Sequence, residues 1–163
     1  MNRRDRVLQQ IHEAFRDVRL GDGVTLHEAL AIDDGASATE RQAARRLDTA
    51  QHWQDVPDEH LGRHEAVLSF LDLTGYVFYA PAYMCWLLRT GHATEWNSAA
   101  EAQLAFPAQG RRDSDRWLQP HEIFSPSQCQ AIAMYLLYVY EVLDKEGFSH
   151  AKEPLDKYWS RFL

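Results

Sequence analysis

The chain has 163 residues, of which 45% are hydrophobic and 12% aromatic, and its formal net charge is −7. This composition supplies enough apolar material for one folded domain over 1–163 and excludes a chain that is disordered throughout. Its basic side chains are scattered among more numerous acids, which argues against nucleic acid as a partner, and its longest apolar run (76–88) is too short to span a membrane.

The first segment is predicted to be an amphipathic helix. Its apolar residues recur at spacings of three and four, so that they share one helix face: Val7, Leu8, Ile11, Phe15 and Val18. We expect no signal peptide, because the segment lacks a continuous apolar core. The two cysteines, Cys85 and Cys129, lie among apolar residues without CxxC spacing, so we expect buried thiols and a cytoplasmic location.

Three sites along the chain carry the signature of a helix start. Thr25 with Glu28, Ser37 with Glu40, and Ser125 with Gln128 each form a capping box, in which two residues satisfy each other's backbone N–H groups. Pro57 suits the first turn of a further helix, and the helix after Ser125 is expected to run to about Leu143. The fold class is therefore predicted as mainly α, in a single compact multi-helix domain.

The segment from Tyr76 to Leu88 has no charged side chain and must be buried. Residues 76–79 are aromatic or β-branched, so a short extended segment is expected there, with Pro81 opening a helix that ends before Gly91. Residues 91–122 are expected to form a loop with one short helix near Ala99 to Leu104. Pro154 is expected to open a last amphipathic helix.

Several motifs in this order resemble a bacterial family of unknown function, the one numbered 6714. They are LHEALAIDDGAS-TERQAAR-LD (26–48), W-x2-VPDEHL (53–61), LSFLDLTGYVFYAPAYMCWLL (68–88), which contains the FYxPAYM pattern, and IFSPSQCQAI (123–132), with a tyrosine–tryptophan pair at 158–159. The resemblance covers roughly residues 5–160 and implies a compact bacterial domain. It implies no activity, so no catalytic residue is carried over from the family.

Candidate metal ligands are few. His60 and His64 are four residues apart, which places both rings on one face of a helix, but neither the HExxH motif nor a third ligand at a defined spacing accompanies them. The sequence indicates a solvated helix face here more strongly than a metal site, and no cofactor is expected. Nucleotide-binding loops and serine or cysteine nucleophile motifs are absent from the sequence.

Two functional hypotheses follow, and oligomerisation through the apolar helix 126–143 is compatible with either of them. The excess acidity lies in residues 21–75, which hold eleven acidic and four basic side chains. This pattern favours a non-enzymatic protein-binding domain, of the immunity or accessory type, for a basic partner. The candidate contacts are Asp33, Asp34, Asp55, Asp58 and Glu59.

The alternative is a small-molecule-binding domain or small enzyme with an aromatic pocket. The pocket candidates are Tyr76, Tyr79, Tyr83 and Trp86, and burial of these side chains in the core is the competing interpretation.

Overall fold

The computed structural model is mainly helical and describes residues 1–63, 65–91, 112–113, 116–145, 147 and 150–163. Its first part contains α1 (Arg3–Ala14), α2 (Leu26–Asp33), α3 (Ala38–Arg45), α4 (Asp58–Arg63) and α5 (Leu73–Thr90), with 3-10 helices at Trp53–Asp55 and Glu65–Phe70. Its second part contains α7 (Pro120–Ile123), α8 (Pro126–Tyr138) and α9 (Lys152–Pro154). The expected mainly α fold is confirmed.

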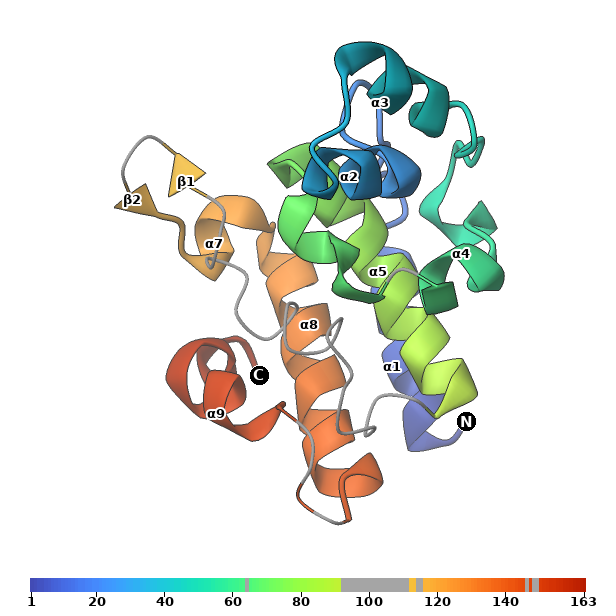
Figure 1. Cartoon of the computed structure of the whole chain (residues 1–163). Helices are drawn as coiled ribbons and strands as arrows, with labels where there is room; N and C mark the ends of the chain where they lie inside the picture. The colour runs from blue at the N-terminus through green and yellow to red at the C-terminus, as the bar shows by residue number, and fades with distance from the viewer. Residues whose placement is uncertain (64, 92–111, 114–115, 146, 148–149) are drawn as a thin grey trace.

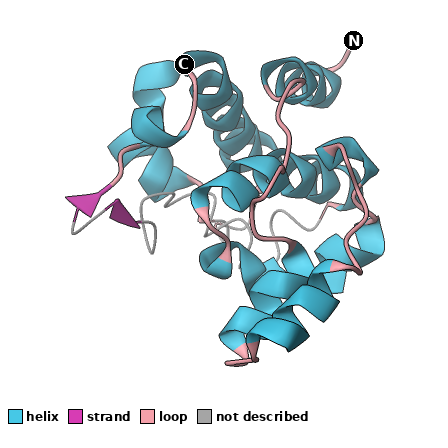
Figure 2. Ribbon diagram, turned by 90° about the horizontal axis from the view of Figure 1, so that it is seen from above, coloured by secondary structure: helices cyan, strands magenta, loops and turns pink. Residues whose placement is uncertain are grey.

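Two short π-helical segments and one short strand pair complete the described chain. The π segments, Val139–Leu143 and Leu155–Trp159, continue α8 and α9, and a 3-10 turn at Ser160–Phe162 ends the chain. The strands β1 (Arg112–Asp113) and β2 (Arg116–Trp117) pair antiparallel, with Arg112 opposite Trp117, at the periphery of the helical body (Figure 2). The expected short helix near Ala99 to Leu104 lies outside the described residues.

The buried residues form one continuous core around α1, α5 and α8. Helix α1 packs against both α5 and α8, while α2 and α3 pair with each other at one end of the molecule (Figure 1). Trp53 connects the α3–α4 segment to α1, since its buried indole N–H donates to the carbonyl of Phe15 at 2.9 Å. No helix in the described part of the chain is long and apolar enough to cross a membrane.

Capping chemistry fixes the helix starts that the sequence indicated. The three capping boxes form as expected. In each, the side-chain oxygen of the first residue accepts a hydrogen bond from the backbone N–H three residues later. Helix α1 is shorter than expected, because it ends at Ala14 with Phe15 as its cap, and Val18 lies beyond it. The last helix begins at Lys152, two residues before Pro154.

The expected extended segment at 76–79 is wrong, and so is a helix start at Pro81. Both lie inside α5, an uninterrupted helix that begins when the Asp72 carboxylate accepts from the N–H of Gly75 at 2.8 Å. Nearly every residue from Gly75 to Leu88 is buried. Aromatic side chains fit such a surrounded helix as well as a strand, because β-propensity reflects packing more than an intrinsic backbone preference.

Candidate functional site

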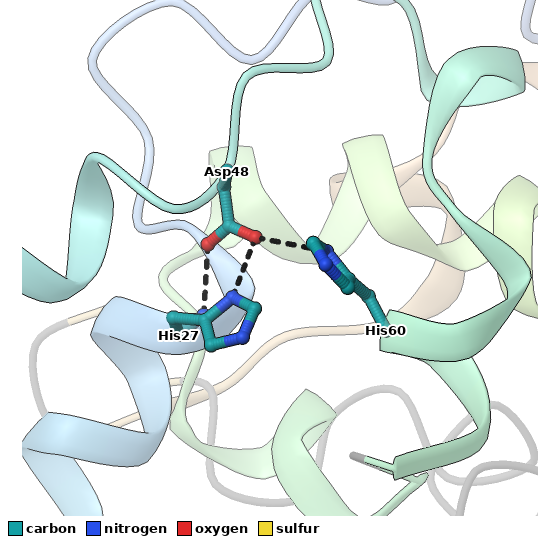
Figure 3. Close-up of side chains that lie close together, drawn as sticks. All are labelled: His27, Asp48 and His60. Carbon is teal, nitrogen blue, oxygen red and sulfur yellow. Dashed lines mark hydrogen bonds and ion pairs between the residues drawn. The ribbon is translucent and has the colours of Figure 1, made fainter.

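The candidate site is a cluster of three side chains that come from three separate parts of the chain: His27, Asp48 and His60 (Figure 3). Each offers a nitrogen or oxygen that can bind a metal, and these atoms all lie within 4.8 Å of one another. The side chain of Asp48 is 5% exposed, whereas the two histidine side chains are 20% and 26% exposed. The carboxylate is therefore held in the protein while the imidazoles reach solvent.

His27 is positioned by the start of α2. Thr25 caps this helix, so His27 occupies its first turn, where backbone N–H groups have no partner within the helix. Asp48 supplies that partner: its Oδ2 accepts from the His27 backbone N–H at 2.8 Å, and its Oδ1 lies 2.8 Å from the ring Nδ1. One carboxylate thus fixes both the backbone and the ring of His27.

Asp48 reaches this position through a turn that follows α3. The N–H of Asp48 donates to the carbonyl of Arg45 at 3.1 Å, which bends the chain back toward α2. Helices α2 and α3 pack against each other, so the turn after the second lies over the start of the first. The position of Asp48 is a product of this helix pair and has no local sequence signal.

His60 approaches the same carboxylate from α4. Its Nδ1 lies 3.5 Å from Asp48 Oδ1, and its ring meets the ring of His27 edge to face, with centroids 4.7 Å apart and an interplanar angle of 85°. Both Nδ1 atoms therefore face one carboxylate oxygen. An arrangement of two imidazoles around one carboxylate is a donor set that zinc accepts.

A cavity of about 250 Å³ opens beside the cluster. It is lined by Asp48, Asp55, Val56, His60 and Tyr79, together with the short segment 49–51 and Pro57. Burial and the nearby Asp48 carboxylate raise the pKa of the Tyr79 hydroxyl, while a hydrogen bond with the Leu26 backbone acts in the opposite direction. The Tyr79 side chain thus remains a neutral phenol.

The other aromatic candidates belong to the core. Tyr76 and Tyr83 are fully buried and Trp86 is 5% exposed. Tyr76 packs on Phe124 with centroids 5.6 Å apart, and Tyr83 meets Trp86 edge to face. Of the four aromatic residues, Tyr79 lines the cavity beside the cluster.

The five acidic candidates are all exposed, but they lie in different surroundings, and only some of them form ion pairs with described residues. Asp58 pairs with Arg89 at 2.6 Å, and Glu59 pairs with Arg63 one helical turn away. Asp33 and Asp34 lie at the end of α2, and Asp55 lies beside the cavity. The ion pairs neutralise part of the charge that the sequence suggested for a docking surface.

Of the two histidines singled out in the sequence, His60 is in the cluster and His64 lies outside the described residues. Sequence reasoning missed the other two members. His27 stood inside a recognised capping box, which explained the segment without reference to its imidazole. Asp48 stood at the end of a segment that resembles the family (26–48), and that resemblance implied no role for it.

Comparison with known proteins gives the family and no activity. The model of a family of unknown function, DUF6714, matches residues 3–163, which is almost the whole chain. No curated protein and no solved structure matches it. The resemblance found in the sequence is therefore confirmed, and the chain belongs to the family DUF6714.

Proposed function

We propose that this protein binds a divalent transition metal of the zinc type through His27, Asp48 and His60. The observation that carries the proposal is the convergence of two imidazoles on one nearly buried carboxylate, with all three donor atoms within 4.8 Å. Three protein ligands with nitrogen and oxygen donors are typical of zinc sites that keep one coordination position open for water or a small molecule.

Two of the three donor-atom distances in the cluster can be compared with those that zinc requires, and all three atoms lie within 4.8 Å of one another. In a tetrahedral site with metal–ligand bonds of about 2.0–2.2 Å, neighbouring ligand atoms lie about 3.4 Å apart. The separation of 3.5 Å between His60 Nδ1 and Asp48 Oδ1 fits this value. The His27 Nδ1 contact of 2.8 Å must open by several tenths of an ångström, as the metal replaces the shared proton.

The cavity beside the cluster supports a function in binding a small molecule at the open position. Its lining combines apolar residues with a few polar ones, among them Tyr79 and Asp55. Such a combination is typical of small-molecule sites. We assign no catalytic step to the protein, and we place this binding function in the cytoplasm of a bacterium, where free buried thiols such as Cys85 and Cys129 stay reduced.

Isothermal titration calorimetry tests the metal site. Protein stripped with a chelator and then titrated with zinc chloride should bind one ion. The variants His60→Gln and Asp48→Asn should weaken zinc binding by about 100-fold or more, because loss of an outer-shell partner alone costs about 10–100-fold.

His121→Gln is the matched control, since His121 is exposed and is not part of the cluster. It should leave the zinc affinity unchanged. A wild-type protein that binds no zinc, or a control variant that loses as much affinity as His60→Gln, would contradict the proposal.

A second candidate function is the binding of a basic protein partner, and the exposure of all five acidic residues favours it. Exposed carboxylates accelerate association with a basic surface, and salt screens the effect. A pull-down with the wild-type protein should then capture one basic partner at low salt and lose it at moderate salt. The double variant Asp33→Asn/Asp34→Asn should fail to capture the partner at either salt concentration. If this variant captured as much partner as the wild type at low salt, Asp33 and Asp34 would not be part of the binding surface.

A further inference from the structure

A second and larger cavity adjoins the His–Asp–His cluster. Its charged lining residues are mostly basic, whereas those of the smaller cavity are acidic. It has a volume of about 580 Å³ and shares Asp48, Ala50 and Gln51 with the smaller cavity. Three arginines line it, Arg19, Arg45 and Arg46, against one acidic residue, Asp48. Arg45 and Arg46 lie within the acidic stretch 21–75, and Arg19 precedes it.

The three guanidinium groups come from two segments that tertiary packing brings together. Arg19 lies in the connection between α1 and α2, and Arg45 and Arg46 end α3. Each guanidinium has five N–H donors in a planar fork that matches the oxygens of a carboxylate or a phosphate. Two or three such groups around one hollow are the usual protein arrangement for binding an oxyanion.

Arg45 is fixed in place by the surrounding structure. Its Nη1 donates to the carbonyl of Gly23 at 2.6 Å and to the Glu28 carboxylate at 2.8 Å, and its Nη2 donates to the carbonyl of Gly21. It therefore shapes the wall of the cavity, and its charge is offset by Glu28.

Arg19 and Arg46 differ from Arg45 in that no carboxylate offsets their charge among the described residues. Arg19 donates through one nitrogen to the carbonyls of Arg16 and Val18, which orients its guanidinium without neutralising it. Within the described ranges of the chain, neither Arg19 nor Arg46 takes part in an ion pair, and both are exposed. Their remaining donors are available to a ligand.

From this geometry we infer that the small-molecule ligand is an oxyanion, a carboxylate or a phosphate, that binds Arg19 and Arg46 and reaches the metal site across Asp48. The metal part of this inference rests on the proposed function. Zinc at Asp48 would add positive charge at the border of the arginine-lined cavity, so the oxyanion should bind more tightly to the zinc-loaded protein than to the metal-free protein.

Nuclear magnetic resonance of ¹⁵N-labelled protein tests the inference. Inorganic phosphate, succinate and chloride are titrated at matched ionic strength, first into chelator-treated protein and then into protein loaded with one equivalent of zinc and desalted. We expect phosphate or succinate to shift the guanidinium Nε–H signals of Arg19 and Arg46, and chloride to leave them in place. The tighter of the two oxyanions identifies the ligand as a phosphate or as a carboxylate.

Arg46→Gln and Arg19→Gln should each weaken oxyanion binding about tenfold, since each removes a charged hydrogen-bond donor. Arg16→Gln removes the same charge from an exposed position three residues from Arg19 that lines neither cavity, and it should change nothing. Equal weakening by Arg16→Gln would overturn the inference, because it would show a general charge effect. So would oxyanions that bind no more tightly than chloride.

The two proposals fail in different ways. If the protein binds no zinc but metal-free protein binds phosphate or succinate in a manner that depends on Arg46, the metal site is refuted and the oxyanion site stands. If zinc binds and neither oxyanion does, the metal site stands and the present inference is refuted. If oxyanion binding is no tighter with zinc than without it, the link between the two cavities is refuted.

Discussion

Asp48 binds His27 through both of its carboxylate oxygens, Oδ2 to the backbone N–H and Oδ1 to the ring Nδ1, each at 2.8 Å. The pair joins the turn after α3 to the start of α2, and His60 of α4 approaches the same carboxylate. Metal-free protein therefore depends on Asp48 for its local structure, whereas metal-bound protein would use it as a ligand.

This relationship predicts a measurable stability effect in the absence of metal. Asp48→Ala leaves the first-turn N–H of His27 without its acceptor, and it should lower the free energy of unfolding by about 2–3 kcal/mol in the presence of a chelator. Urea denaturation measures this change. Asp34→Ala, at an exposed position at the end of α2, should change it by less than about 0.5 kcal/mol. Equal effects of the two substitutions would show that Asp48 has no special structural role.

Gly75 allows the first turn of α5 to pass close to the chain before α2. A Cβ at this position would overlap the carbonyl oxygen of Val24, and backbone atoms have little room to move. Gly75→Ala should therefore destabilise the protein by about 1–3 kcal/mol, although alanine is the better helix former. Thermal denaturation checks this, with Thr74→Ala, at the exposed position before Gly75, as a near-neutral comparison. A gain in stability from Gly75→Ala would contradict the packing.

Both thiols should be unreactive in the folded protein. Burial raises the pKa of Cys85 to about 12 and that of Cys129 to about 11, so the reactive thiolate is scarce at pH 8. Ellman's reagent should react with neither cysteine in native protein and with both after unfolding in guanidinium chloride. Rapid reaction of one thiol in native protein would place that cysteine at an accessible site.

His12 should make the protein less stable in mild acid. His12 is exposed, but its contact with the Trp53 ring removes part of its hydration; this desolvation, and to a lesser extent the charge of Arg89, lower the pKa of His12 below 6.5 in the folded state. The unfolded chain then takes up the proton first as pH falls, so this contribution is complete above pH 6.5 and is lost as pH drops from 6.5 toward the lower folded value.

The comparison of wild type with His12→Gln isolates this contribution. Urea midpoints measured from pH 7.5 to pH 5 should fall more steeply for the wild type than for the variant. Parallel curves for the two proteins would mean that His12 titrates in the folded state as it does in the unfolded chain.

Features that depend only on residues close together in the sequence could be predicted from it. Thr25 and Glu28, or Ser125 and Gln128, are three residues apart, so their capping boxes can be recognised without knowledge of the fold. Val7, Ile11 and Phe15, which were expected to share one helix face, are buried for the same reason, because local apolar spacing marks the inner face of a segment.

Local reasoning failed where tertiary packing decides the outcome. Tyr76 to Tyr79 have residue types common in strands, but a helix surrounded by protein accepts them, and Pro81 is retained inside α5. The candidate site was beyond the reach of spacing rules, because His27, Asp48 and His60 are brought together by the packing of α2 and α3 and by the start of α4. Arg19 and Arg46 line one cavity because tertiary packing brings the segment after α1 close to the end of α3.

The central claim is that His27, Asp48 and His60 hold one metal ion, and anomalous X-ray diffraction at the zinc edge tests it most directly. Crystals of protein loaded with one equivalent of zinc should show a single strong peak about 2.0–2.2 Å from a donor atom of each of the three residues. A peak at any other position, or none between these three side chains, would contradict the account.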